Sequence, residues 1–185
     1  MTSQDHRREL YGTFELAAAI VSGVDRAQLA QPTLCEDYDV AKLISHLVGA
    51  AKRAVMLGRG ETLEDGAFPD VDVAEAPGQL RAAGEQAAEA WGNDSRLLDT
   101  TTMPWGETYT GATLVDMYFA ELAAHSYDLA VATGQLEKLD PDLAQPALVA
   151  ARAMLKPEYR NLLGQGNPFG DEVIPPPDAG EWERF

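Results

Sequence analysis

The chain has 185 residues, 45% of them hydrophobic, which suits one domain large enough to bury a core. Its formal net charge of −16 argues against nucleic acid and anionic membrane surfaces as partners, because both are negatively charged. Residues 1–9 are polar and no apolar run approaches the roughly 20 residues that span a bilayer, so we expect neither a signal peptide nor a membrane span.

Two helices are predicted in the first third of the chain. Apolar residues at spacings of three and four predict a helix over about 5–24. A loop over 28–37 follows, and Asp37 or Asp39 is a candidate N-cap for the second helix. Residues 58–78 are rich in Gly, Asp, Glu and Pro and have little periodicity, which predicts a long connection.

The middle of the chain carries the strongest helical pattern. A third helix is predicted over about 78–91, and residues 95–110 favour a short hairpin or an extended loop because their helix propensity is weak. The fourth helix follows, with an apolar run over 114–133 and Thr110 or Thr113 as its cap.

The last part of the chain is predicted to hold one more helix and an irregular tail. Gly134 is a natural residue to end the fourth helix, and a fifth helix is predicted over 141–155. The tail over about 156–185 is rich in Pro and Gly. We therefore expect a single all-α domain over 1–185, with its helical bundle at about 5–155.

Two histidines and a glutamate are candidate metal ligands. Glu121 and His125 are four residues apart, so their side chains leave one helix face one turn apart. Glu121 has apolar neighbours, and a buried carboxylate there needs water, a partner or a metal ion. If the second and fourth helices are neighbours, His46 could meet this pair. Two imidazoles and one carboxylate suit zinc, nickel or iron(II) with open coordination positions.

A simpler interpretation covers the same residues. A histidine in an apolar segment is more often a hydrogen-bonded core residue than a ligand, and Glu-x-x-x-His is a common contact on helices. The third histidine, His6, lies in the polar N-terminal segment and is expected to be exposed.

Two further residues could assist at such a site. Asp128 follows His125 by three residues and could accept a hydrogen bond from its imidazole, or it could be a surface acid. Arg53 follows His46 by seven residues on the same helix face. It could bind an anionic group of a substrate, or it could be a solvated helix residue.

Three other side chains have open roles. Cys35, the single cysteine, cannot form an internal disulfide, which favours a cytoplasmic protein. Its thiol could have a lowered pKa next to a helix start, or it could be a buried structural group. Trp105 and Tyr109 could line the mouth of a pocket or pack in the core. No phosphate-binding glycine loop or Gly-x-Ser-x-Gly turn is present.

Several segments together resemble the DinB-like superfamily, and within it the actinobacterial proteins related to the N-terminal domain of mycothiol-dependent maleylpyruvate isomerase. The resemblance lies in PTLCEDYDV at 32–40, LISHLVG at 43–49, PWG at 104–106, ELAAHSYDLA at 121–130, FGDEV at 169–173 and PPDA at 176–179. It implies a four-helix bundle with a long crossover between helices two and three, here with a short extra helix. It also implies a divalent metal ion on His46, Glu121 and His125.

The resemblance implies an enzyme, a metal-dependent transferase or isomerase that uses a low-molecular-weight thiol such as mycothiol. Zinc is the expected ion, with nickel or iron as alternatives, and Arg53 and Asp128 would assist. The partners would be the thiol and an electrophilic substrate. A non-catalytic metal- or ligand-binding module and a non-haem iron oxygenase stay open as alternatives. Bundles of this kind often pair, so a homodimer is one expected assembly.

Overall fold

The computed structural model describes residues 5–35, 38–64, 70–155 and 174–185, and this part of the chain is mostly helical. Its α-helices are α1 (Arg7–Val21), α2 (Val40–Gly58), α3 (Ala76–Ala90), α4 (Gly111–Thr133) and α5 (Pro141–Met154). Two short strands, β1 (Thr100–Thr102) and β2 (Thr108–Thr110), pair antiparallel between α3 and α4. The predicted all-α class is confirmed, as is a hairpin within 95–110.

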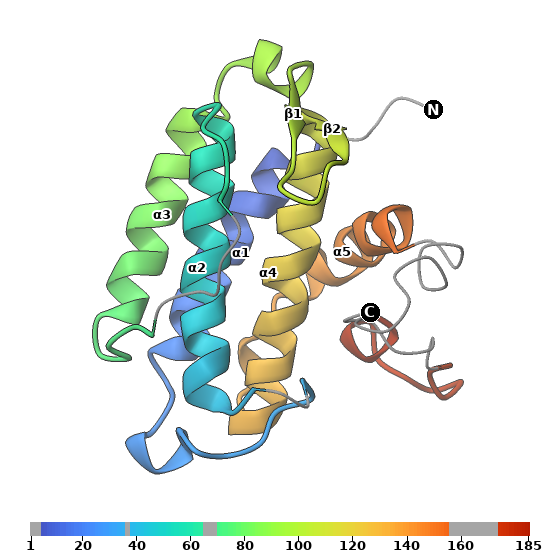
Figure 1. The fold of residues 1–185 in the computed structure, drawn as a ribbon. Helices are drawn as coiled ribbons and strands as arrows, with labels where there is room; N and C mark the ends of the chain where they lie inside the picture. The colour runs from blue at the N-terminus through green and yellow to red at the C-terminus, as the bar shows by residue number, and fades with distance from the viewer. Residues whose placement is uncertain (1–4, 36–37, 65–69, 156–173) are drawn as a thin grey trace.

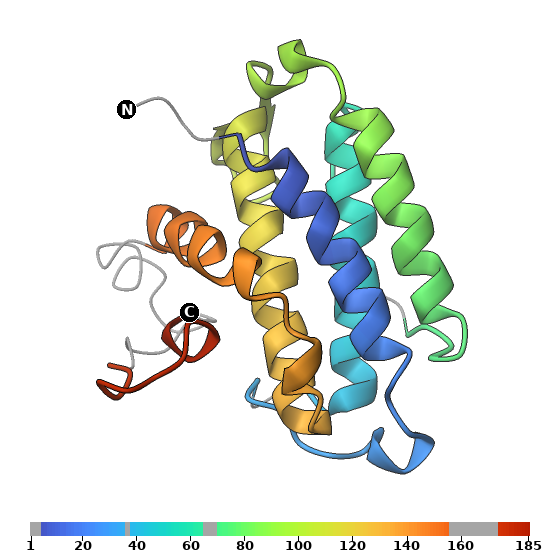
Figure 2. The ribbon, with the colours of Figure 1, turned by 180° about the vertical axis from the view of Figure 1, so that it is seen from behind.

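The first four helices form a four-helix bundle in which sequence neighbours are not always neighbours in space (Figure 1). Each of α1 and α2 packs against both α3 and α4, whereas α1 and α2 themselves scarcely touch. The view from behind shows α1 between α3 and α4 on the far side from α2 (Figure 2). Since α2 and α4 run antiparallel side by side, residues in their middle turns face one another.

Local signals at the ends of α2 and α4 explain why these helices begin and stop where they do. The Asp39 carboxylate accepts a hydrogen bond from the backbone N–H of Lys42 at 2.9 Å, which makes Asp39 the N-cap of α2. The Thr110 hydroxyl accepts one from the N–H of Thr113 at 3.2 Å. Gly134 then ends α4 with a φ of 71°, a left-handed conformation that glycine adopts without strain. These three boundaries confirm the predicted caps, with Asp39 and Thr110 as the ones used of the alternatives.

The core lies where the apolar faces of the helices meet. Leu43, Ile44 and Leu47 of α2 and Phe119 and Leu122 of α4 are fully buried. Each such side chain stabilises the fold by about 1.5–3 kcal/mol relative to exposure. This packing holds α2 and α4 in fixed register, and it therefore fixes the positions of the polar side chains between them.

The N-terminal histidine, His6, was predicted to be exposed but is buried. His6 is only 3% exposed, and its Nδ1 lies 2.8 Å from Oδ1 of Asp116 on α4. Its ring also packs 5.6 Å from that of Phe119. The prediction was wrong because it considered only the polar sequence around His6, whereas His6, directly before α1, lies against α4 and finds a carboxylate partner there.

The C-terminal tail is described only from residue 174, so most of its predicted irregular course lies outside the described residues. Trp182 is buried, stacks on Tyr127 of α4 with ring centroids 6.2 Å apart, and donates its indole N–H to the carbonyl of Asp140 at 3.0 Å. This end of the tail is therefore packed on the bundle, beside α4 and α5. Among the described helices, none has the length and apolar character needed to cross a membrane.

Candidate metal centre

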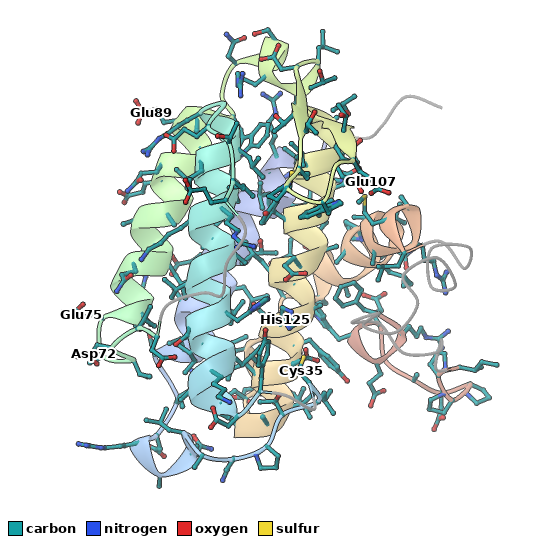
Figure 3. The ribbon with its side chains drawn as sticks, in the orientation of Figure 1. Cys35, Asp72, Glu75, Glu89, Glu107 and His125 are labelled. Atoms are coloured by element: carbon teal, nitrogen blue, oxygen red, sulfur yellow. The ribbon has the colours of Figure 1, made fainter. Side chains whose placement is uncertain are left out.

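Three donor groups converge between α2 and α4. The Nε2 atom of His46 on α2 lies 2.8 Å from Oε1 of Glu121 on α4, and Nε2 of His125, one turn further along α4, lies 3.5 Å from the same oxygen. The two imidazole rings meet edge to face with centroids 4.6 Å apart. In Figure 3, His125 lies between the two helices. The structure thus brings together the three residues that the sequence singled out as candidate ligands.

These side chains are sheltered but not sealed. The side chains of His46 and His125 are 13% and 16% exposed, and that of Glu121 is 34% exposed. A structural metal site is closed on all sides by protein ligands, whereas a catalytic site keeps a position open. The partial exposure of Glu121 fits the open kind.

Each group in the cluster stabilises a charged form of its neighbours. Burial raises the pKa of the Glu121 carboxyl, but the hydrogen bonds and charges of His125 and His46 outweigh it and hold the pKa well below its usual range. Burial lowers the pKa of His125, but hydrogen bonds with Asp128, Cys35 and Glu121 outweigh it and raise the pKa to about 12. Without a metal ion, the cluster therefore holds a carboxylate and an imidazolium, and a bound cation would take the place of the imidazolium proton.

A second set of contacts orients the imidazoles. Nδ1 of His125 lies 3.1 Å from Oδ2 of Asp128, so this nitrogen donates its proton to the carboxylate and leaves Nε2 toward Glu121. Nδ1 of His46 lies 3.4 Å from the hydroxyl of Tyr38. Both rings thus present Nε2 to the centre and hold Nδ1 against an oxygen-bearing side chain, and a hydrogen bond to the second nitrogen is common in histidines that bind metals.

Cys35 lies at this cluster, a placement that the sequence did not predict. Its Sγ is 3.3 Å from Oδ2 of Asp128 and 3.6 Å from Nδ1 of His125, and the residue is partly buried. Figure 3 shows Cys35 close to His125. Cys35 lies in the loop before α2, and its thiol contacts residues of α4 that are about 90 positions later in the chain. No local sequence pattern predicts a contact over that separation.

Comparison with known proteins places the chain in a family. The family model for the mycothiol maleylpyruvate isomerase N-terminal domain matches residues 14–130. The chain belongs to this family. Two uncharacterized proteins of Mycobacterium tuberculosis, from strains CDC 1551/Oshkosh and H37Rv, are each 36% identical to it over 157 residues, which cover 84% of this chain and 80% of the relative. No solved structure matches the chain.

The matched residues of the isomerase-domain family include His46, Glu121, His125 and Asp128. They extend from α1 through most of α4, which are the helices that build the site. The predicted family resemblance is confirmed by this match.

A pocket of about 170 Å³ opens beside the donor cluster in this family member. It extends along the groove between α2 and α4 toward the hairpin, and its lining is His46, Ala50, Arg53, Trp105, Met117, Tyr118 and Glu121. Trp105 lies in the hairpin turn and is 55% exposed, and the ring of Tyr109 packs beside it with ring centroids 6.5 Å apart. Tyr109 is not one of the residues that line this pocket. Two candidate metal ligands thus share a pocket with a guanidinium and with aromatic side chains.

The donor set passes a chemical test for a divalent cation. One donor atom from each of His46, Glu121 and His125 lies within 4.8 Å of the other two, which is close enough for all three to reach one ion. Two imidazole nitrogens and one carboxylate oxygen are a known ligand set for zinc in catalytic sites and for iron(II) in oxygenases. The residues present therefore fit a divalent metal ion with open coordination positions.

Proposed function

We propose that the protein binds a divalent metal ion, zinc first among the candidates, and acts as a thiol-dependent transferase or isomerase with a low-molecular-weight thiol such as mycothiol. One observation carries the proposal. Nε2 of His46 and Nε2 of His125 both lie close to the Glu121 carboxylate, and two of these three residues, His46 and Glu121, also line a pocket. A closed coordination shell would favour a non-catalytic metal-binding module, and the pocket favours an enzyme instead.

The proposed ligands are His46, Glu121 and His125. When bound, a divalent ion supplies Lewis acidity that lowers the pKa of a coordinating thiol, so that the thiol is held as the nucleophilic thiolate at neutral pH. Asp128 accepts the Nδ1 proton of His125 and keeps that ring in the tautomer that leaves Nε2 available. The chain thus provides both the donors and the hydrogen bond that orients one of them.

The pocket residues suit an electrophilic substrate that carries an anionic group. Arg53 follows His46 by seven residues on α2, so the two side chains leave the same helix face about 10 Å apart along the helix axis. A guanidinium at this distance can bind a carboxylate while the reactive carbon lies near the donor cluster. Trp105 and Met117 line the same pocket and add apolar surface for the body of such a substrate.

Family membership supports the thiol part of the proposal. The matched family takes its name from the N-terminal domain of mycothiol maleylpyruvate isomerase, an enzyme named for its thiol. The two mycobacterial relatives are uncharacterized, so they give no information about the activity.

Metal content is the first test, and the chain offers a matched control for it. Glu121→Gln removes a proposed ligand, whereas Glu89→Gln makes the same change at an exposed position of α3, away from the cluster. We expect elemental analysis to find one or more bound divalent ions per wild-type and Glu89→Gln chain. We expect Glu121→Gln and His125→Ala each to contain at least one ion fewer per chain. Equal metal content in all four proteins would overturn the site.

Activity is the second test. Metal-loaded protein is mixed with mycothiol and an electrophilic carboxylate, and loss of free thiol or rearrangement of the electrophile is followed. Turnover that requires both the metal ion and the thiol supports the proposal. Oxygen consumption by iron-loaded protein without thiol would instead favour a non-haem oxygenase. Absence of thiol binding and of turnover in metal-loaded protein would leave a metal-binding module.

A further inference from the structure

The face of His125 that points away from Glu121 carries a second group of metal-type donors. Sγ of Cys35, Oδ2 of Asp128 and Nδ1 of His125 lie within 4.8 Å of one another. The thiol and the carboxylate contact His125 but are not ligands in the three-ligand cluster proposed above. A thiol, a carboxylate and an imidazole are all donors that zinc accepts.

The spacing of these three atoms suits tetrahedral coordination. Ligand bonds of about 2.0–2.3 Å at tetrahedral angles place neighbouring donor atoms about 3.3–3.6 Å apart. The observed separations are 3.3 Å between Cys35 Sγ and Asp128 Oδ2, 3.6 Å between Cys35 Sγ and His125 Nδ1, and 3.1 Å between Asp128 Oδ2 and His125 Nδ1. An ion could therefore enter with displacements of a few tenths of an ångström.

We infer that a second divalent ion of borderline or soft character, such as zinc, binds between Cys35, Asp128 and Nδ1 of His125. The imidazole of His125 then bridges two ions, one on each nitrogen. The inference rests on the proposed function for the first ion, which uses Nε2 of the same ring. The sulfur ligand selects against magnesium and calcium, which prefer oxygen donors.

Charge balance supports both the one-ion and the two-ion forms. With one divalent ion on Nε2 and a neutral imidazole, the carboxylates of Glu121 and Asp128 balance the two positive charges. With two ions, four positive charges are balanced by Glu121, Asp128, the Cys35 thiolate and the imidazolate of His125. The thiol proton and the Nδ1 proton leave to solvent when the second ion binds. Neither form leaves an uncompensated charge. This matters because the side chains of Asp128 and His125 are only 16% exposed, and an unpaired charge in a sheltered site is costly.

The experiment uses cobalt(II) as a spectroscopic probe on the metal-free full chain. Cobalt is added stepwise, bound equivalents are counted, and the near-ultraviolet absorption from sulfur-to-cobalt charge transfer is recorded. We expect two equivalents per wild-type chain, with the sulfur band rising during the second. Cys35→Ser keeps a small polar side chain but loses the soft donor, so we expect it to bind one equivalent without a sulfur band.

A further variant separates this inference from the proposed function. His46→Ala removes a ligand of the first ion and leaves all three donors of the second. A sulfur band in wild type that persists in His46→Ala and is absent in Cys35→Ser supports the second site. One equivalent in wild type without a sulfur band overturns the second site and leaves the first standing. A single equivalent with a sulfur band that survives His46→Ala overturns the first site and keeps the second. No bound cobalt overturns both.

Discussion

The imidazole of His125 is held between two carboxylates, and its contact with Asp128 decides which nitrogen is available. Nδ1 lies 3.1 Å from Oδ2 of Asp128, while Nε2 lies 3.5 Å from Oε1 of Glu121. Because Asp128 is three residues after His125 on α4, the helix itself sets this contact. The ring is thereby oriented before any cation arrives.

Removal of this orienting carboxylate should weaken binding of the first ion without removing a ligand. In Asp128→Asn we expect an affinity about 10- to 100-fold lower than in wild type, which is the usual cost of losing such a partner. The measurement is competition with a chromophoric chelator under conditions that load a single ion. Asp178→Asn, at an exposed tail position, is the matched control. An unchanged affinity in Asp128→Asn would mean that the carboxylate does not orient His125.

Metal affinity should rise with pH because the ion competes with a proton on His125. The contacts that raise the pKa of His125 to about 12 keep the metal-free ring protonated throughout the neutral range. Binding through Nε2 must therefore displace one proton, and each unit of pH removes a factor of ten from the proton concentration. We expect the apparent affinity to increase about tenfold per unit between about pH 6 and 8. Titrations at several pH values in non-chelating buffers measure this slope, and a flat profile would contradict it.

Part of the site could be predicted because its signals are local. The four-residue spacing of Glu121 and His125 places both on one turn of a helix whose N-cap, Thr110, and terminal Gly134 are visible in the sequence. Helical periodicity and caps depend on residues close together in the chain. For that reason α4 matches its predicted limits closely.

The other part depends on which helices become neighbours. The sequence of α2 does not indicate that this helix packs against α4 and not against α1. Periodicity alone therefore could not predict that His46 lies beside Glu121 and His125. The loop that brings Cys35 to Asp128, and the N-terminal segment that buries His6 against Asp116, are likewise long-range contacts. Family resemblance supplied the helix arrangement that periodicity lacked, but it did not reveal either of these contacts.

The pocket predicts a specific effect for the guanidinium of Arg53. Arg53→Met keeps an unbranched side chain in the lining and removes the charge. A hydrogen bond to a charged group contributes about 1.5–3 kcal/mol, so KM for an anionic electrophile should rise by about 10- to 150-fold. Metal content and KM for a neutral electrophile should stay as in wild type. Steady-state kinetics with a matched pair of substrates, one a carboxylate and one its amide, measures the difference.

Arg81→Met provides the control for a general effect of charge, because Arg81 lies on α3 and pairs with Glu15 instead of lining the pocket. It should leave both KM values unchanged. An Arg53→Met protein with the same preference for the carboxylate substrate as wild type would contradict the assignment of Arg53 to substrate binding.

The N-cap of α2 offers a test of how the fold supports the site. Asp39→Ala removes the acceptor for the N–H of Lys42 and should lower the free energy of unfolding by about 1 kcal/mol, whereas Asp39→Asn preserves the cap and should cost little. Urea denaturation of the metal-free proteins measures both. His46 lies beyond the first turn of α2, and Leu43 and Leu47 beside it are fully buried, so fraying at Asp39 should not displace its imidazole. We therefore expect Asp39→Ala to bind metal as wild type does, and a loss of metal content in this variant would show that the helix start, and not core packing alone, positions His46.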